Sequence, residues 1–230
     1  MIKKLDSILL GDNVVDNFYN TYNSDPLFKK WLDNILPEIE LCEKQCQRNP
    51  WHKYNVLGHI LHSVDAMNSQ TKDLPDRDRR LLAYTMFLHD IGKPACHIVR
   101  KKDGKMIDSF FNHNIESAKI AKRSAESLGF DNNDAIILEK LVYKHDIFMF
   151  IKDYSTTNQH WRQLTPSLIE DEISDLNLVG DGAKLMKYLV MVGRSDNLAQ
   201  NEKMTAESLA LTKRFDELLL ERQNKTNNNA

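Results

Sequence analysis

The sequence predicts an all-α fold. Apolar residues recur at helical spacing along almost all of the 230 residues. Only eight glycines and six prolines interrupt this spacing, and only one short segment favours β-strands. Because a chain of this length can fill one hydrophobic core, we expect one main helical domain.

The helices can be placed from their start signals and apolar stripes. Asp25 and Pro26 begin a predicted helix that ends near Ile35, and Pro37 separates it from a second helix through Cys46. Residues 1–50 therefore form a predicted N-terminal helical extension. Further helices are expected at 54–69, 76–89, 114–128, 133–144, 181–192 and 205–222.

The remaining segments are less regular. Asp103 and Gly104 form a turn signal between residues that favour extended backbone, so a small β-hairpin is expected within 97–111. Residues 146–180 are irregular and partly aromatic, and their role is not predicted. We expect residues 51–200 to form the main domain, 201–222 a C-terminal helix that packs on it, and 223–230 a disordered polar tail.

Composition limits the classes of function. The 31 basic residues are balanced by 33 acidic ones, so the overall charge does not indicate a DNA partner. No apolar stretch approaches the roughly 20 residues of a membrane span, and no signal peptide is evident. Three cysteines favour free thiols in a reducing compartment, so a cytoplasmic protein is expected. Cys42, Cys46 and His52 leave open a zinc site, although such sites usually have four closely spaced ligands.

Several helices carry a polar group where the apolar stripe calls for a hydrophobic one. The stripe of the 181–192 helix leads to Asp196, and that of the 133–144 helix leads to His145. The apolar 76–89 helix ends in His89 and Asp90. At about 100° per residue, the 54–69 helix places His59 beside its apolar stripe and His62 on its polar face. Buried groups of this kind need partners.

A single histidine of this type is usually an ordinary core residue that finds a hydrogen-bond partner. The six residues together are stronger evidence for a shared site. Coincidence is a poor explanation for four imidazoles and two carboxylates at helix ends or stripe edges. Metal binding would stabilise all of them together.

These residues resemble the motifs of the HD superfamily of metal-dependent phosphohydrolases. The likeness spans roughly residues 27–200 and is closest to the helical HD-domain part of tRNA nucleotidyltransferases (CCA-adding enzymes), to which LFKKWLDNILPEIELCEKQ and GRSDNLAQ are similar. No nucleotidyltransferase head motif is present, so polymerisation is not expected. The motifs are NVLGHILHSV with His59, FLHDIGKP with His89 and Asp90, FFNHNIESA with His113, LVYKHD with His145, and GRSDNLAQ with Asp196.

The resemblance implies an HD-domain helical bundle with a metal centre. It implies that His59, His89, Asp90 and Asp196 hold one divalent ion and that Asp90 bridges to a second ion held by His113 and His145. Nitrogen and oxygen ligands suit Mn, Fe, Co, Ni or Zn better than Mg. The sequence departs from the family pattern at Asn112 and Asn114, which flank the third-motif histidine.

The expected activity is hydrolysis of a phosphomonoester or cyclic phosphodiester of a nucleotide or RNA end by a metal-activated hydroxide. Asp90 and Lys93 are the predicted catalytic residues, with Lys93 facing phosphate. His62 and Arg194 are weaker candidates for substrate binding, and solvated or ion-paired roles also account for them.

Two other functions stay open. One is hydrolysis of a dinucleoside polyphosphate or a nucleoside triphosphate. The other is a non-catalytic, metal-stabilised RNA-binding module, suggested by basic residues at 100–105 and 119–123. The oligomeric state is not predicted.

Overall fold

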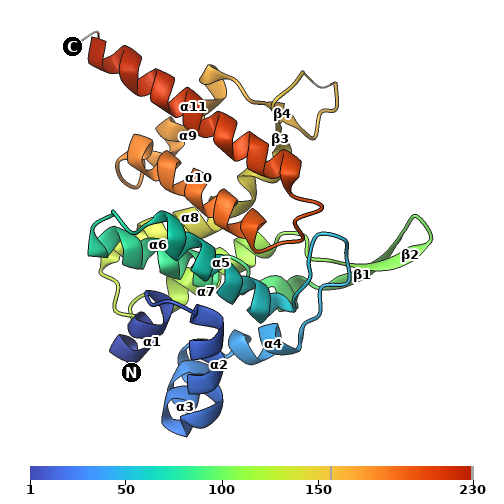
Figure 1. Cartoon of the computed structure of the whole chain (residues 1–230), viewed down its shortest axis with the longest axis vertical. Coiled ribbons are helices and arrows are strands. Elements are labelled where there is room, and N and C mark those ends of the chain that lie inside the picture. The colour runs from blue at the N-terminus through green and yellow to red at the C-terminus, as the bar shows by residue number, and fades with distance from the viewer. Residues whose placement is uncertain (156, 229–230) are drawn as a thin grey trace.

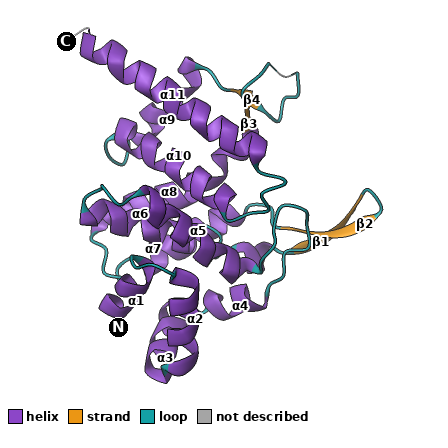
Figure 2. Ribbon diagram, in the orientation of Figure 1, coloured by secondary structure: helices purple, strands orange, loops and turns teal. Residues whose placement is uncertain are grey.

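The computed structural model describes residues 1–155 and 157–228, and it confirms the all-α fold. Eleven α-helices make up most of this part of the chain, with two small pairs of strands beside them (Figure 2). Among these helices, none combines the length and the apolar character that crossing a bilayer requires.

The N-terminal extension consists of four short helices, α1 (Ile2–Leu9), α2 (Val14–Ser24), α3 (Pro26–Ile35) and α4 (Glu38–Lys44). The side chain of Asp25 caps α3 by accepting hydrogen bonds from the backbone N–H groups of Leu27 and Phe28, as the start signal predicts. Phe18 stacks on Tyr22 and also contacts Phe87 of the main domain. The extension therefore shares one core with the rest of the protein.

Four helices form the centre of the main domain, and α5 packs on α6 as α7 packs on α8 (Figure 1). Residues 81–91 are buried without interruption, so α6 from Leu81 onward is surrounded by protein on all sides, as its apolar sequence indicates. The bounds of these helices are α5 (Val56–Gln70), α6 (Asp76–Leu88), α7 (His113–Ser124) and α8 (Asn132–Lys144).

The C-terminal part contains α9 (Pro166–Leu176), α10 (Gly182–Leu198) and α11 (Ala206–Asn228). Helix α9 was not predicted, although Thr165 and Pro166 form a start signal: Thr165 caps the helix and Pro166 lies in its first turn. Within the predicted disordered tail at 223–230, residues 223–228 are instead helical, and residues 229–230 lie outside the described part of the chain. Near this end of α11, Arg222 pairs with Glu170 of α9.

The predicted hairpin is present. Strands β1 (Ile98–Lys102) and β2 (Lys105–Ser109) pair antiparallel, and both Asp103 and Gly104 adopt positive φ in the turn. The hairpin projects from the helical body (Figure 1). Its base is held by Asp108, whose carboxylate accepts hydrogen bonds from the backbone and guanidinium of Arg48 and lies 2.9 Å from His97 Nε2.

The unassigned segment 146–180 contains a 3₁₀ helix, η2 (His145–Phe150), and a two-residue parallel pair, β3 (Ile151–Lys152) and β4 (Arg162–Gln163), before α9. A second 3₁₀ helix, η1 (Lys93–Cys96), follows α6.

Candidate metal centre

Five separate elements deliver the six predicted ligands to one buried place. The ligand atoms of His59, His89, Asp90 and Asp196 lie within 4.8 Å of one another, and so do those of Asp90, His113 and His145. His59 comes from α5, His89 and Asp90 from the end of α6, His113 from the start of α7, His145 from the start of η2, and Asp196 from α10.

The first group is built around two imidazoles that face each other. His59 Nε2 and His89 Nε2 are 3.3 Å apart. Asp90 Oδ2 lies 3.2 Å from the first of these nitrogens and 3.4 Å from the second. Asp196 Oδ1 lies 2.9 Å from His59 Nε2 and 3.7 Å from His89 Nε2.

The second group repeats this arrangement on the other oxygen of Asp90. His113 Nε2 and His145 Nε2 are 3.2 Å apart. Asp90 Oδ1 lies 3.0 Å from His113 Nε2 and 3.6 Å from His145 Nε2. One carboxylate therefore connects both pairs of imidazoles.

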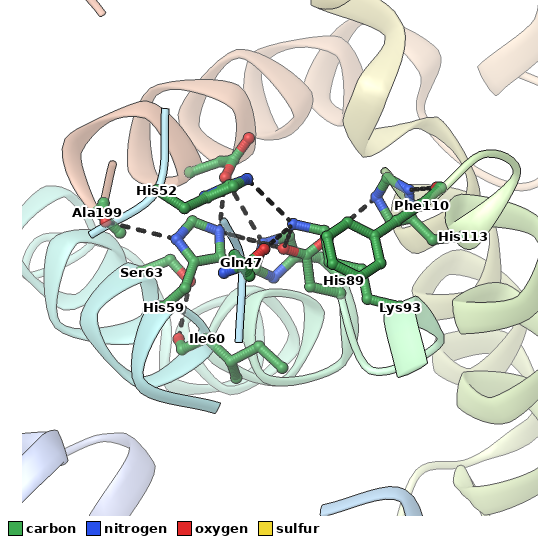
Figure 3. Close-up of polar contacts among 12 residues, drawn as sticks. Gln47, His52, His59, Ile60, Ser63, His89, Lys93, Phe110, His113 and Ala199 are labelled. Carbon is green, nitrogen blue, oxygen red and sulfur yellow. Dashed lines mark hydrogen bonds and ion pairs between the residues drawn. The ribbon is translucent and has the colours of Figure 1, made fainter. Parts of the chain in front are cut away.

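Backbone carbonyls orient all four rings. The Nδ1 atoms of His89, His113 and His145 lie 2.6 to 2.7 Å from the carbonyl oxygens three residues earlier. His59 Nδ1 lies 3.4 Å from the carbonyl of Ala199 (Figure 3). In a neutral ring, a protonated Nδ1 that donates to a carbonyl leaves the lone pair on Nε2, which is the usual state of a metal-binding histidine.

Electrostatics at the centre favour a positive charge between the rings. Burial alone would lower the pKa of His89, but Asp90 and Asp196 raise it to about 9. Burial opposes ionisation of Asp90 as well, yet Lys93 and His89 hold the pKa of this carboxyl well below its usual range. Burial also opposes ionisation of Asp196, but His59 and His89 hold the pKa of this carboxyl well below its usual range.

The donor set fits divalent ions. Two pairs of ring nitrogens face each other at 3.2 and 3.3 Å, so neutral rings would direct lone pairs at one another. Asp90 Oδ2 is buried and has no hydrogen-bond partner of good geometry, although nitrogens surround it. Protons or metal ions between the rings would resolve both problems, and mixed nitrogen and oxygen donors suit first-row transition metals.

Lys93, the predicted phosphate-facing lysine, lies beside Asp90 and is buried. Its Nζ is 2.5 Å from Asp90 Oδ2 and donates to Gln47 Oε1 at 2.9 Å. His52 Nε2 is 3.5 Å from the same nitrogen (Figure 3). Burial and then the Lys93 ammonium lower the pKa of His52 to about 2, so this imidazole stays neutral.

Two glycines allow close packing between the elements that carry the candidate ligands. A Cβ on Gly193 of α10 would lie 2.4 Å from the ring of Phe148, so the absence of a side chain lets η2 approach α10. A Cβ on Gly92 would lie 2.5 Å from the backbone nitrogen of Ser117, and Gly92 N–H donates to Ser117 Oγ. These glycines set the distance from His145 and Asp90 to their neighbours.

The two weaker candidates for substrate binding, His62 and Arg194, contact side chains outside the six candidate ligands. His62 stacks on Tyr54 with ring centroids 4.1 Å apart. Arg194 donates to Gln70 and pairs with Asp216, so it connects α10 to α5 and α11. The alternative zinc site does not form, because Cys42 is buried with its thiol toward the carbonyl of Ile91 while Cys46 is exposed.

Sequence reasoning missed three residues at the centre: Gln47, His52 and Asp146. The first two lie in a loop without periodicity, so no stripe reveals their direction. Asp146 did carry a signal. It follows His145 at the end of a helix in the same way that Asp90 follows His89.

Comparison with known families agrees with this geometry. Residues 56–179 match the HD domain family, which is more than half of the chain, and the protein belongs to this family. The match includes five of the six candidate ligands and ends before Asp196. No curated protein matches the chain significantly. Membership assigns the protein to the superfamily of metal-dependent phosphohydrolases.

Proposed function

We propose that this protein hydrolyses a phosphomonoester or cyclic phosphodiester of a nucleotide or RNA end. The observation that carries the proposal is Asp90, which contacts one facing pair of imidazoles with each of its oxygens. A carboxylate in this position can bridge two ions. When bound, such ions lower the pKa of a coordinated water and neutralise charge on phosphoryl oxygens.

The chain's own residues supply the remaining roles. His59, His89, Asp90 and Asp196 would hold one ion, and Asp90, His113 and His145 the other. Mn, Fe, Co, Ni or Zn suit these donors better than Mg. The Lys93 ammonium lies beside the shared carboxylate, and its charge is available to a phosphoryl oxygen that enters the centre.

A patch beside the centre supports a nucleotide or RNA substrate. Trp51 precedes His52 and is 39% exposed, and Phe111 is 58% exposed and lies two residues before His113. Lys102 Nζ is 5.5 Å from the centroid of the Trp51 ring, and the Arg100 guanidinium is 5.2 Å from that of Phe111. Exposed rings next to cations can stack nucleobases and attract phosphates.

The structure weighs against a non-catalytic RNA-binding module that uses α7. Its basic residues are each paired with an acid: Lys119 with Glu116, Lys122 with Glu139, and Arg123 with Glu38. Paired charges contribute little to counterion release on nucleic acid. In the described part of the chain, the basic residues of the hairpin have no acidic partner, so of these two basic groups the hairpin is the one more available to a polyanion.

The closer resemblance to the helical part of CCA-adding enzymes also belongs to this proposal. It rests on the helices before His59 and on the GRSDNLAQ stretch, both largely outside the matched range of 56–179. The reduced, unpaired cysteines favour action in the cytoplasm.

The test is a panel of substrates presented to the protein loaded with Mn²⁺, Co²⁺, Ni²⁺ or Mg²⁺. The panel contains nucleoside monophosphates, 2′,3′-cyclic nucleotides and RNA ending in a cyclic phosphate, together with nucleoside triphosphates and dinucleoside polyphosphates. We expect turnover of the first three and its loss in Asp90→Ala. Hydrolysis confined to the polyphosphates would favour the alternative enzyme. RNA binding without turnover under any metal would contradict a hydrolase.

A further inference from the structure

Asp146 contacts the second pair of imidazoles. Its Oδ2 lies 3.2 Å from His113 Nε2, and its Oδ1 lies 3.5 Å from His145 Nε2. Its side chain is only 16% exposed, so the carboxylate faces the rings rather than bulk water. Around a divalent ion with bonds of about 2.1 Å, neighbouring donor atoms are separated by distances close to these two.

Asp146 lies beside the second imidazole pair much as Asp196 lies beside the first, although only Asp196 belongs to a group whose ligand atoms all lie within 4.8 Å of one another. Each of these carboxylates touches both nitrogens of one imidazole pair, and each pair is also touched by one oxygen of Asp90. Their side chains are 18% and 16% exposed, respectively. The resemblance implies a ligand role for Asp196, but no motif implies one for Asp146.

The charge balance points the same way. In the described residues, Asp146 makes no ion pair with a lysine or arginine, and its close polar partners are the two imidazoles. A carboxylate that is largely removed from water needs a compensating positive charge. An ion held between the two rings would supply that charge.

We infer that Asp146 is a carboxylate ligand of the second ion. The protein then has two sites, each with two histidines and two aspartates, that share Asp90. The two oxygens of Asp146 contact different rings, which suits a carboxylate that presents both oxygens to one ion. This inference rests on the proposed metal centre, and it concerns binding of the second ion rather than the identity of the substrate.

The experiment measures metal content and affinity rather than turnover. Metal-free protein is titrated calorimetrically with Mn²⁺, and bound metal is counted by elemental analysis. Asp146→Asn keeps the size of the side chain and removes its charge. Asp103→Asn, in the exposed hairpin turn, removes the same charge away from the centre and serves as the matched control. Asp196→Asn tests the first site.

We expect two ions in the wild-type protein and in Asp103→Asn. In Asp146→Asn, the affinity for the second ion should fall at least about tenfold while the first ion stays bound. In Asp196→Asn, the affinity for the first ion should fall while the second ion stays bound. Asp146→Glu, which restores a carboxylate, should recover part of the second affinity and guards against a variant that is merely misfolded.

Wild-type affinity for both ions in Asp146→Asn would overturn the inference and leave the proposed function standing. A single ion in the wild-type protein would also overturn it, while a one-ion hydrolase would remain. Wild-type protein that binds no divalent ion would instead overturn the proposed function itself, and the inference with it.

Discussion

Lys93 Nζ lies 2.5 Å from Asp90 Oδ2, closer than any imidazole nitrogen around that oxygen. The carboxylate that joins the two imidazole pairs is therefore also paired with a buried ammonium. Gln47, from the loop before α5, holds the same ammonium by a hydrogen bond. Lys93 thus stands between the ligand set and the loop that covers it.

Replacing Lys93 should affect catalysis more than metal binding. In Lys93→Met, loss of a fixed cation near the reacting phosphoryl group should lower kcat/KM by roughly 10²- to 10³-fold. Metal content, measured by elemental analysis, should stay at the wild-type value. Lys72→Met, at an exposed position, is the control and should match the wild type. Parallel loss of metal and activity would instead show that Lys93 only positions Asp90.

Stability without metal should fall as the pH rises from about 6.5 to 9. Burial lowers the pKa of His59, His89 and His145, but nearby carboxylates raise each above its usual value, for His89 to about 9. A folded-state pKa above the unfolded one stabilises the protein below about pH 6.5, and this contribution is lost as the pH passes the folded value.

Metal should reverse this dependence, because metal and protons compete for the same ring nitrogens. Thermal unfolding in chelator and in Mn²⁺ at pH 6, 7.5 and 9 checks this. We expect Tm in chelator to decrease over the series and the increase in Tm caused by Mn²⁺ to grow. Identical pH trends in both conditions would show that the imidazoles do not exchange protons for metal.

Arg194 should prove to be a stabilising residue. Its guanidinium donates to Gln70 and pairs with Asp216. Arg194→Gln should lower the free energy of unfolding by about 1 kcal/mol and leave KM and metal content unchanged. Urea unfolding of Arg194→Gln, Asp216→Asn and the double variant measures the coupling between the two residues. A raised KM in the single Arg194 variant would restore the prediction that this residue binds substrate.

Acid should release the base of the hairpin. Arg48 lowers the pKa of the buried Asp108 carboxyl well below 3.8, and His97 contributes in the same direction. A depressed folded-state pKa stabilises the protein above the unfolded value and loses this effect as the pH falls through the folded one. Asp108→Asn should therefore cost about 2 kcal/mol at pH 7 and progressively less below pH 4. Urea unfolding of the wild type and Asp108→Asn at pH 7 and below pH 4 tests this. A difference in the free energy of unfolding that does not change with pH would contradict it.

Much of the fold and the grouping of the six candidate ligands could be predicted because burial leaves a strong trace in sequence. Helical spacing showed where Asp196 and His145 must point, and the Asp25–Pro26 start and the Asp103–Gly104 turn appear in the structure as expected. The family motifs supplied His113, whose helix begins at that residue and so gives no stripe to read.

Other features depend on tertiary contacts that a sequence does not display. Gln47 and His52 reach the centre only because their loop folds back over Lys93. Helix α11 extends through a polar segment, where Arg222 pairs with Glu170 of α9. Arg194 was a weaker candidate for substrate binding because it could pair with a carboxylate instead, and the carboxylate it pairs with is Asp216 of α11, which its own helix does not reveal.

Gly92 and Gly193 carry no chemistry, yet the spacing of the whole centre depends on them. A single methyl group at position 193 would press on the Phe148 ring and move the segment that begins with His145. Inactivating substitutions in this protein can therefore arise at residues that no inventory of reactive groups would include, and their signature would be misaligned ligands that are all still present.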